Sequence, residues 1–363
     1  MGEAGFAGNE EARGVRAVVI TEFGAEPSLV ERPDPTPDPD GVVVAVEATG
    51  LCGSDRFAWR GHDDGVALPL VPGHELVGRV VAVGPEVRRV REGDRVLTPF
   101  VEGCGRCAAC AEGQAQVCPD QEQPGFTHDG SFAELVALRH ADTNCVAVPE
   151  ALDAAGAALL GCRVATAYRA VVDRGRVSAG DRVLVLGAGG VGLAAVLIAT
   201  GLGAEVVAAD PSPAARARAL ELGATAALDP GELPGVLDGG ALDGGGAHVA
   251  VEAAGRPESL ALGVRSLRRQ GTLVQVGLLA SEPVVPVPDM VARELAVVGS
   301  HGMAATDYPA LMDLVATGRL DPGRLVTRRI GLAEAPAALA APPVAGEVVV
   351  IEPGRAPGGS DVP

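Results

Sequence analysis

The sequence predicts an α/β protein in which a β-rich domain precedes a domain built on a doubly wound parallel sheet. Three observations lead to this fold class. The chain has 363 residues, more than one typical core accommodates. Up to about residue 141, short apolar runs alternate with Gly, Pro and Asp, which is typical of antiparallel strands and turns. After residue 181, apolar runs alternate with helix-like segments, which indicates βαβ units.

The elements follow in chain order. In the β-rich domain, strands are expected at residues 16–20, 41–50, 78–84 and 94–100, and Ala-rich helical segments begin at residue 153. The parallel sheet is expected from strands at 181–187, 204–210, 248–255, 271–279 and 294–300, with helices at 191–203 and 213–223. A helix at 308–318 and a strand at 346–353 fit either domain. Residues 231–246 are expected to form a loop, and the tail from residue 354 to be disordered.

The composition excludes several classes of function. Formal net charge is −18, which disfavours nucleic acid and anionic membranes as partners. All 29 basic residues are Arg, so a Schiff-base lysine and the lysine of a phosphate-binding P-loop are excluded. Residues 1–14 lack the apolar stretch of a signal peptide. We therefore expect a cytoplasmic protein, in which cysteines bind metals more often than they form disulfides.

One uncharged stretch, residues 183–204, is long enough to suggest a membrane span. It contains six glycines, however, and acidic residues flank it, so a buried strand, a tight turn and a buried helix explain it better. The turn fits the dinucleotide-binding fingerprint. Its glycines permit a sharp turn, close approach of the backbone to a pyrophosphate, and packing of the helix on the strand. The residues of this candidate site are Gly187, Gly189, Gly190, Val191 and Gly192.

An acidic residue ends the strand after this turn. Asp210 lies eighteen positions beyond Gly192, where a carboxylate would bind the adenosine ribose and repel a 2′-phosphate. The cofactor is therefore expected to be NAD rather than NADP. Arg216 and Arg218, on the following helix, are the residues that would favour NADP instead.

Four of the seven cysteines lie within fifteen residues, in the spacing C-x2-C-x2-C-x7-C: Cys104, Cys107, Cys110 and Cys118. Thiolates this close together can surround one tetrahedral zinc ion. Four sulfur ligands leave no position for water or substrate, and such a closed site is structural. An iron–sulfur cluster uses similar spacing, but nothing else in the sequence indicates electron transfer. We predict a structural zinc site.

An open zinc site must come from the remaining cysteines and the six histidines. The patterns GLCGSD and PGHE offer Cys52 and His74 as ligands, with Asp55 and Glu75 as acids that would orient the imidazole and tune the metal. Cys162, in LLGCRVATAY, is the third candidate, although a lone cysteine in an apolar helix is often a core residue. A ligand at that position would place the metal in the cleft between the domains.

The motifs GLCGSD, VPGHELVGRV, the four-cysteine spacing, LLGCRVATAY and LGAGGVGLAAV occur in this order between about residues 15 and 352. In these features the chain resembles the zinc-dependent medium-chain alcohol dehydrogenases. The resemblance implies a GroES-like catalytic domain over residues 1–163, a Rossmann domain over 164–299 and a C-terminal segment, 300–363, that completes the catalytic domain. It also implies a homodimer or homotetramer with two zinc ions per chain.

The resemblance assigns roles to individual residues. It implies that Cys52, His74 and Cys162 bind the catalytic zinc, with Asp55 and Glu75 behind them, and that the four-cysteine segment binds the structural zinc. It implies that Thr166 contacts the nicotinamide, and it leaves Cys145 in the core. The implied reaction passes hydride between NAD(H) and a small alcohol and its aldehyde or ketone, with zinc as the Lewis acid.

One position departs from the family pattern. Ser54 stands where family members begin a proton relay, but Phe57 replaces the histidine that many of them carry three residues later. Water, a ribose hydroxyl or His62 are the open substitutes. A related reductase of activated alkenes or iminium ions is therefore the alternative enzyme. A non-catalytic NAD(H) or zinc sensor is disfavoured because all three catalytic ligands are present.

The expected substrate site is apolar. Phe57, Trp59 and Leu278 are candidate walls, with Leu278 beside the cofactor, and they favour an uncharged or weakly polar alcohol. A polyol enzyme would more often use an acid as third ligand, so Cys162 argues mildly against a sugar substrate. His301 and Met303 either reach the cleft or belong to the core.

Overall fold

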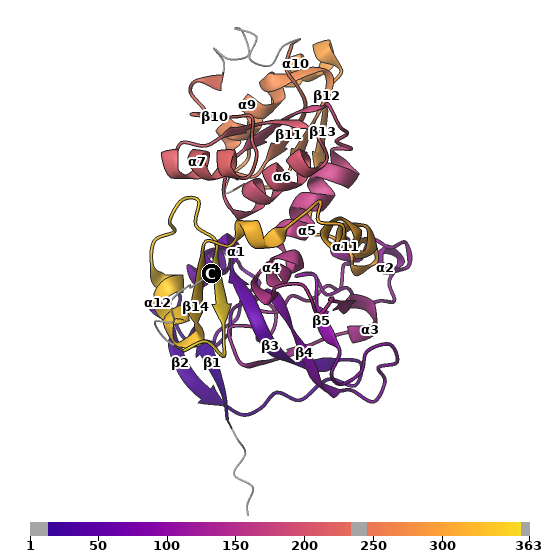
Figure 1. The fold of residues 1–363 in the computed structure, drawn as a ribbon, viewed down its shortest axis with the longest axis vertical. Coiled ribbons are helices and arrows are strands. Elements are labelled where there is room, and N and C mark those ends of the chain that lie inside the picture. Colours follow the sequence, from indigo (N-terminus) through magenta and orange to yellow (C-terminus); the bar gives the residue numbers. More distant parts are fainter. Residues whose placement is uncertain (1–13, 234–244, 280, 357–363) are drawn as a thin grey trace, which may run out of the picture.

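A computed structural model describes residues 14–233, 245–279 and 281–356 of the chain. Figure 1 shows two bodies along the long axis, the β-rich one below and the parallel sheet with its helices above. The C-terminal segment, drawn in yellow, lies beside the indigo N-terminal strands of the lower body. Most of the loop expected at 231–246 and of the tail expected from residue 354 lies outside the described residues.

The strands of the lower body pair antiparallel, except for the last two, which run parallel to each other. In chain order these are β1 (Val15–Val19), β2 (Ser28–Arg32), β3 (Val42–Leu51), β4 (Glu75–Val83), β5 (Arg95–Leu97), β6 (Leu135–Leu138), β7 (Val146–Ala147), β14 (Arg328–Gly331) and β15 (Val349–Glu352). The main sheet has the order β14-β15-β3-β4-β5-β7, with β6 paired to β3, while β1 and β2 pair with each other. The strands expected at 16–20, 41–50, 78–84 and 94–100 are thus confirmed as β1, β3, β4 and β5.

The end of the chain returns to this sheet. β15 pairs antiparallel with β3, so that Val349 lies opposite Leu51 and Ile351 opposite Thr49. Val350 and Ile351 are fully buried in the process. The sequence did not determine which body this strand belongs to. Its pairing with β3 assigns it to the β-rich body. β3 is also the strand that ends directly before Cys52.

The upper body holds a six-stranded sheet. Its strands are β8 (Arg182–Leu186), β9 (Glu205–Ala209), β10 (Ala226–Leu228), β11 (Ala247–Glu252), β12 (Leu267–Gln275) and β13 (Ala296–Gly299). They run parallel in the order β10-β9-β8-β11-β12-β13. From β8 the chain moves outward to β9 and β10. From β11 it moves outward in the opposite direction, to β12 and β13. The crevice at the carboxyl ends of β8 and β11 is therefore a topological switch point, where such sheets bind ligands.

The helices cover the sheets and connect the bodies. They are α1 (Gly53–Trp59), α2 (Ala108–Ala111), α3 (Ala141–Asn144), α4 (Ala154–Ala158), α5 (Arg163–Tyr168), α6 (Gly190–Gly201), α7 (Pro213–Glu221), α9 (Pro257–Ser266), α10 (Val287–Arg293), α11 (Tyr308–Ala316) and α12 (Ala335–Ala340). One apolar core runs through α4, α5, α6 and β8 and includes Met303 and Val350. The two bodies are therefore packed on a shared core, with α5 and α6 at their junction (Figure 1).

The uncharged stretch 183–204 divides, as expected, into β8 and α6. The residues of α6 from Gly192 to Ala199 are all buried, which explains why this helix carries no charge on any face. Among the described residues, no single helix is long and apolar enough to cross a membrane. One bent pair, Ala154–Gly161 with Arg163–Arg174, meets the requirement by length and composition only.

Candidate metal centre and dinucleotide site

The first candidate ligand sits where β3 passes into α1. Cys52 precedes the first residue of α1, and its backbone N–H donates to Asp55 Oδ2 at 2.7 Å. This bond satisfies one of the N–H groups that a helix start leaves without a partner. Asp55 is fully buried, and its second oxygen, Oδ1, lies 2.9 Å from Nδ1 of His74.

His74 lies directly before β4 with only 1% of its surface exposed. Gly73 makes this approach possible: its φ is +105°, and a Cβ there would lie 2.4 Å from the ring of Phe132. Burial lowers the pKa of His74, but the charge and hydrogen bond of Asp55 outweigh it, and the pKa is raised well above its usual value. Because Asp55 holds Nδ1, the opposite nitrogen Nε2 is the one free to bind a metal.

The ligand atoms of Cys52, His74, Glu75 and Cys162 all lie within 4.8 Å of one another. They come from three separate segments, at the end of β3, the start of β4 and the residue before α5. The hydrogen bond from Cys162 lowers the pKa of Cys52 well below the usual thiol value, and that same bond raises the pKa of Cys162. The two sulfurs thus share a proton that a bound cation would displace.

Glu75 is engaged elsewhere. Its oxygens accept from the backbone N–H of Arg163 at 2.8 Å, from Nε at 2.9 Å and from Nη2 at 2.6 Å. Both residues are buried, with 0% of Glu75 and 3% of Arg163 exposed. The geometry therefore offers Cys52, His74 and Cys162 as three ligands, with the carboxylate of Glu75 turned to the arginine behind them. Three protein ligands with an open fourth position are typical of a catalytic zinc site.

Aromatic rings surround His74. The rings of Phe100 and Phe126 meet the imidazole edge-on at centroid distances of 6.1 and 5.3 Å. The chain has only six Phe, so the placement of two beside the metal ligand makes this an apolar site. The ring of His301 packs against Phe100 at 5.3 Å, and its Nδ1 lies 3.0 Å from the carbonyl oxygen of Gln116.

Phe57 and Trp59 were expected to line the substrate site, and Met303 was expected either in the cleft or in the core. Phe57 is half-buried on α1, beside the exposed ring of His62 at 5.2 Å. Trp59 is not a wall of the site, because it is buried in a separate core and donates its indole N–H to Ala25 O at 2.6 Å. Met303 is 1% exposed and belongs to the shared core.

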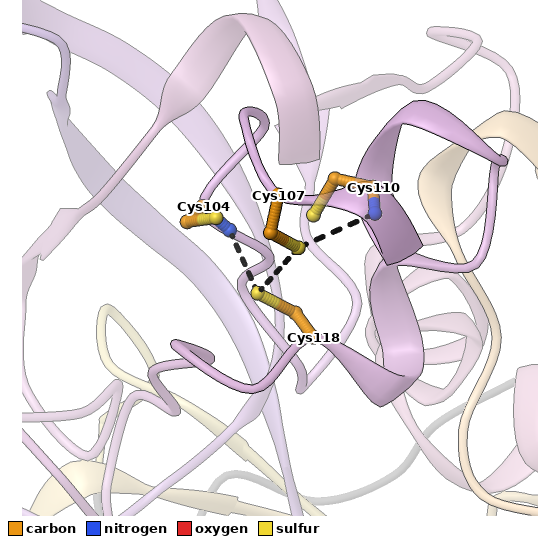
Figure 2. A group of neighbouring side chains, drawn as sticks. All are labelled: Cys104, Cys107, Cys110 and Cys118. Atoms are coloured by element: carbon orange, nitrogen blue, oxygen red, sulfur yellow. Dashed lines mark hydrogen bonds between the residues drawn. The ribbon is translucent and has the colours of Figure 1, made fainter.

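The four-cysteine segment forms a second cluster. Figure 2 shows the sulfurs of Cys104, Cys107, Cys110 and Cys118 turned toward a common centre, and all four lie within 4.8 Å of one another. The sulfurs of Cys107 and Cys118 are 3.6 Å apart, too far for a disulfide. Asn144 braces the loop by exchanging two 3.0 Å hydrogen bonds with the backbone of Gly103.

The cysteines of this cluster differ in their pKa values, and therefore in how readily they lose the proton that a cation must replace. Backbone hydrogen bonds, the largest from Arg106, lower the pKa of Cys104 to about 6. Burial raises the pKa of Cys110 to about 12. An ion would therefore displace protons from some of these thiols as it binds. Cys145 lies outside both clusters and packs against the core of the main sheet, where burial raises its pKa.

The glycine-rich turn lies between β8 and α6. Gly187 has φ +89°, and a Cβ there would lie 2.7 Å from the backbone nitrogen of Ala254. A Cβ on Gly192 would lie 1.8 Å from Gly187 O, so the helix can approach the strand only without one. Nothing lies within 4 Å of a Cβ placed on Gly189, which leaves the space in front of the helix N-terminus open. Gly190 and Val191 begin α6 at this opening.

The other residues expected at the cofactor surround this turn. Asp210 follows β9, and its Oδ2 accepts from the backbone N–H of Ala188 at 2.8 Å. Thr166, one turn into α5, is 7% exposed, and its hydroxyl has no hydrogen-bond partner among the described residues. Leu278 follows β12 and is 71% exposed. Its backbone closely approaches Gly255 in the loop after β11.

Comparison with known proteins identifies the family. The alcohol dehydrogenase GroES-like domain matches residues 38–150, and the zinc-binding dehydrogenase domain matches residues 190–317. An alcohol dehydrogenase of Rhizobium meliloti is 35% identical over 84% of this chain and 89% of its own length. The chain belongs to the zinc-dependent medium-chain alcohol dehydrogenase family. It is accordingly a zinc-dependent oxidoreductase with a GroES-like part and a Rossmann-type parallel sheet, as the sequence predicted.

Two further relatives show the breadth of this family. L-galactonate-5-dehydrogenase of Escherichia coli is 31% identical over 86% of this chain and 91% of its own length. A crystal structure of a zinc-binding dehydrogenase from Sinorhizobium meliloti 1021, bound to NADP, superposes with a TM-score of 0.85 at 33% identity. That match covers 94% of this chain and 99% of the other. Substrate and nicotinamide cofactor therefore vary among proteins of this fold.

The residues present fit both groups that the family binds. The two sulfur-rich clusters supply the soft donors that zinc prefers. The space before Gly189 and the unpartnered hydroxyl of Thr166 suit a dinucleotide that crosses from the upper to the lower body. Zinc would thus be held by cysteine and histidine, and the nicotinamide would lie toward α5.

Three site residues were missed at the level of sequence. Phe100 and Phe126 reach the site only through the fold, and no local pattern marks them. Arg163 carries a signal: it is the single charge in LLGCRVATAY, and it adjoins a candidate ligand. A charge inside an apolar segment needs a buried partner, and Glu75 is that partner.

Proposed function

We propose that the chain is an NAD-dependent alcohol dehydrogenase for small, uncharged alcohols and their aldehydes or ketones. The observation that carries the proposal is the convergence of Cys52, His74 and Cys162 beside α5, while Arg163 holds Glu75 away from the open position. Zinc held there would supply a Lewis acid for the alcohol or carbonyl oxygen. NAD would supply the hydride acceptor, and the Cys104–Cys118 cluster would hold a second, structural zinc.

The chain's own residues prepare the site for this reaction. Asp55 fixes the ring of His74 so that Nε2 faces the metal position. Ser54 Oγ lies 3.2 Å from Nε2, so its hydroxyl is placed to receive a proton from an alcohol bound beside His74. Phe57 cannot pass that proton on, and His62 is exposed beside its ring. A proton leaving Ser54 must therefore reach solvent through water, a cofactor hydroxyl or His62.

The choice of NAD rests on charge around Asp210. A carboxylate at the end of β9 repels a 2′-phosphate. Neither neighbouring arginine is free to compensate. Arg216 Nη1 donates to the carbonyl of Asp210 at 2.8 Å and lies 3.6 Å from Asp229. Arg218 pairs with Glu221 at 2.6 Å.

The substrate class follows from the rings around His74. Phe100 and Phe126 offer no hydrogen bonds to the hydroxyls of a polyol, and desolvating those hydroxyls without partners is costly. The site therefore favours a small apolar or aromatic alcohol. Reduction of an activated alkene or iminium ion is the second candidate, because Phe57 interrupts the proton route that alcohol oxidation requires.

We also propose a homo-oligomer, a dimer or a tetramer, in the cytoplasm. β13 ends the upper sheet, and its outer edge has no strand partner among the described residues. Beside it, Val284, Val287 and Val291 are 84%, 55% and 75% exposed on and before α10. A second copy pairing at this edge would cover these valines. The two cysteine-containing clusters suit a reducing compartment, where cysteines bind metals more often than they form disulfides.

The test is absorbance at 340 nm with primary, secondary and aromatic alcohols, polyols and their carbonyl partners, each with NAD(H) and NADP(H) on zinc-replete protein. We expect turnover of simple alcohols with NAD⁺ and little with polyols. Turnover of polyols alone would contradict the assigned substrate class. NADH binding without turnover of any alcohol or carbonyl would favour alkene or iminium reduction.

A further inference from the structure

Arg163 and Glu75 form a buried ion pair. A fully buried ion pair is costly to desolvate, and an apolar pair could fill the same volume. Here the pair adjoins a candidate metal ligand, since Arg163 follows Cys162 directly. It also extends to the other body of the protein. Nη1 of Arg163 would lie 3.1 Å from a Cβ placed on Gly190, the first residue of α6.

The five N–H groups of the guanidinium are used unequally. Nε and Nη2 donate to Glu75, and Nη2 also donates to the carbonyl of Leu51 at 3.0 Å. Nη1 has no hydrogen-bond acceptor among the residues that the structure describes. Arg163 as a whole is only 3% exposed, so an Nη1 without an acceptor points to a ligand, and it lies at the N-terminus of the twelve-residue helix α6, whose first N–H groups have no carbonyl partner within the helix.

We propose that Arg163 is a positioning residue that joins the two halves of the site. Its Nε–Nη2 edge holds Glu75 behind the metal ligands, and its Nη1 contacts the pyrophosphate of the bound dinucleotide at the start of α6. The inference rests on the proposed dinucleotide function. It assigns to one side chain both the withdrawal of Glu75 from the metal and the recognition of phosphate. Binding of the phosphates is then coupled to the geometry of the metal ligands.

The test separates phosphate contact from a merely structural role. Adenosine and ADP-ribose share the nucleoside, but only ADP-ribose has the pyrophosphate, and neither carries a nicotinamide that could reach the metal. Calorimetric titration of both ligands is compared for the zinc-replete wild type and Arg163→Lys. We expect affinity for ADP-ribose to fall about tenfold or more, the loss expected for one charge-assisted hydrogen bond, while affinity for adenosine changes less than about twofold.

Two further variants keep the test decisive. Arg95→Lys is the matched control, because Arg95 is also a buried arginine paired with a glutamate, Glu47 at 2.7 Å, but its other hydrogen bonds go to the carbonyls of Pro149 and Leu152 and none to the start of α6. It should leave both ligands unaffected. If Arg163→Lys fails to fold, the double variant Glu75→Gln with Arg163→Met removes both charges and leaves no buried ion unpaired. We expect it to show the same selective loss of ADP-ribose.

A second readout addresses the coupling. Cobalt(II) placed at the Cys52–His74–Cys162 site reports ligand geometry through its thiolate charge-transfer bands. ADP-ribose should shift these bands in the wild type and not in Arg163→Lys. Equal loss of adenosine and ADP-ribose affinity, or no loss of either, would overturn the phosphate contact, and unchanged bands in the wild type would overturn the coupling. Wild-type protein that binds neither ligand would instead refute the dinucleotide function itself.

Discussion

Asp55 and His74 form a fully buried pair, with Oδ1 of the carboxylate 2.9 Å from Nδ1 of the imidazole. The second oxygen of Asp55 holds the backbone of Cys52 at 2.7 Å. One side chain therefore orients two of the three candidate metal ligands. The position of the metal depends on Asp55 even though its carboxylate does not point to the metal.

Asp55→Asn should weaken zinc binding at this site by about 10- to 100-fold, because the amide keeps the shape but loses the charge that supports the imidazole. Competition with a zinc chelator measures the effect. Asp94→Asn is the control, since Asp94 also accepts a backbone N–H, from Arg91 at 2.9 Å, but lies in a surface turn. Equal zinc affinity in the Asp55 variant and the wild type would show that Asp55 only caps α1.

Ser54→Ala should lower kcat for alcohol oxidation by about 100-fold or more, because the hydroxyl 3.2 Å from His74 Nε2 is the first proton acceptor. Zinc content and NADH affinity should not change. The pH profile of kcat separates this role from a structural one, because the loss should shrink at high pH, where hydroxide replaces the relay. Ser54→Thr should retain activity. A kcat equal to that of the wild type at neutral pH would exclude Ser54 from the relay.

Cys107→Ser should lower the melting temperature and cause loss of one zinc ion per chain, because the cluster holds a loop that has little apolar core of its own. Zinc analysis and a thermal scan check both effects. Cys145→Ser, which alters a cysteine outside both clusters, should keep the zinc. A Cys107 variant with normal melting but no turnover would place the chemistry in the four-cysteine site instead.

Asp210→Asn should shift the ratio of NAD to NADP affinity toward NADP by about tenfold or more, because the charge that repels the 2′-phosphate is removed. Asparagine keeps an acceptor for the N–H of Ala188, so the glycine turn retains its support. Asp289→Asn on α10 is the control, because it removes a carboxylate from the same body without changing the partners of Arg216 or Arg218. An unchanged ratio, measured by fluorescence titration with NADH and NADPH, would remove Asp210 from the ribose.

Asp153 ties the start of α4 to β14 through Arg329, with Oδ2 2.8 Å from Nη2. Burial raises the pKa of Asp153, but the hydrogen bonds from Arg329 and Gly156 outweigh it, so its pKa in the folded state is lowered. The pair therefore stabilises the fold above the unfolded pKa, and that contribution disappears as the pH falls through the lowered folded value.

Asp153→Asn keeps the helix cap and should cost less than about 1 kcal/mol at pH 7, because the pair is partly exposed. The difference from the wild type should begin to shrink below about pH 4 and vanish only once the pH is below the lowered folded pKa of Asp153. Urea unfolding at both pH values tests this prediction. A difference that persists at low pH would assign the effect to packing rather than to charge.

Much of this protein follows from sequence alone. The alternation of strands and helices after residue 181 specifies a parallel sheet, because each apolar segment is too short to be buried in any other way. The four cysteines between residues 104 and 118 are close in the chain, so their convergence requires only local turns. The same holds for the glycine turn, where Gly187 and Gly192 meet within one strand–helix junction.

Only the tertiary structure decided the rest, because those contacts join segments that no local pattern relates. Cys52 and Cys162 are distant in sequence, and the pairing of β3 with β4 and the packing of α5 bring them within 4.8 Å. The same packing turned Glu75 to Arg163, placed Phe100 and Phe126 beside His74, and buried Trp59 away from the site. The amino-acid sequence determines which side chains are available for chemistry. Burial and charge pairing in the folded chain decide which of them face the open fourth position of the metal site.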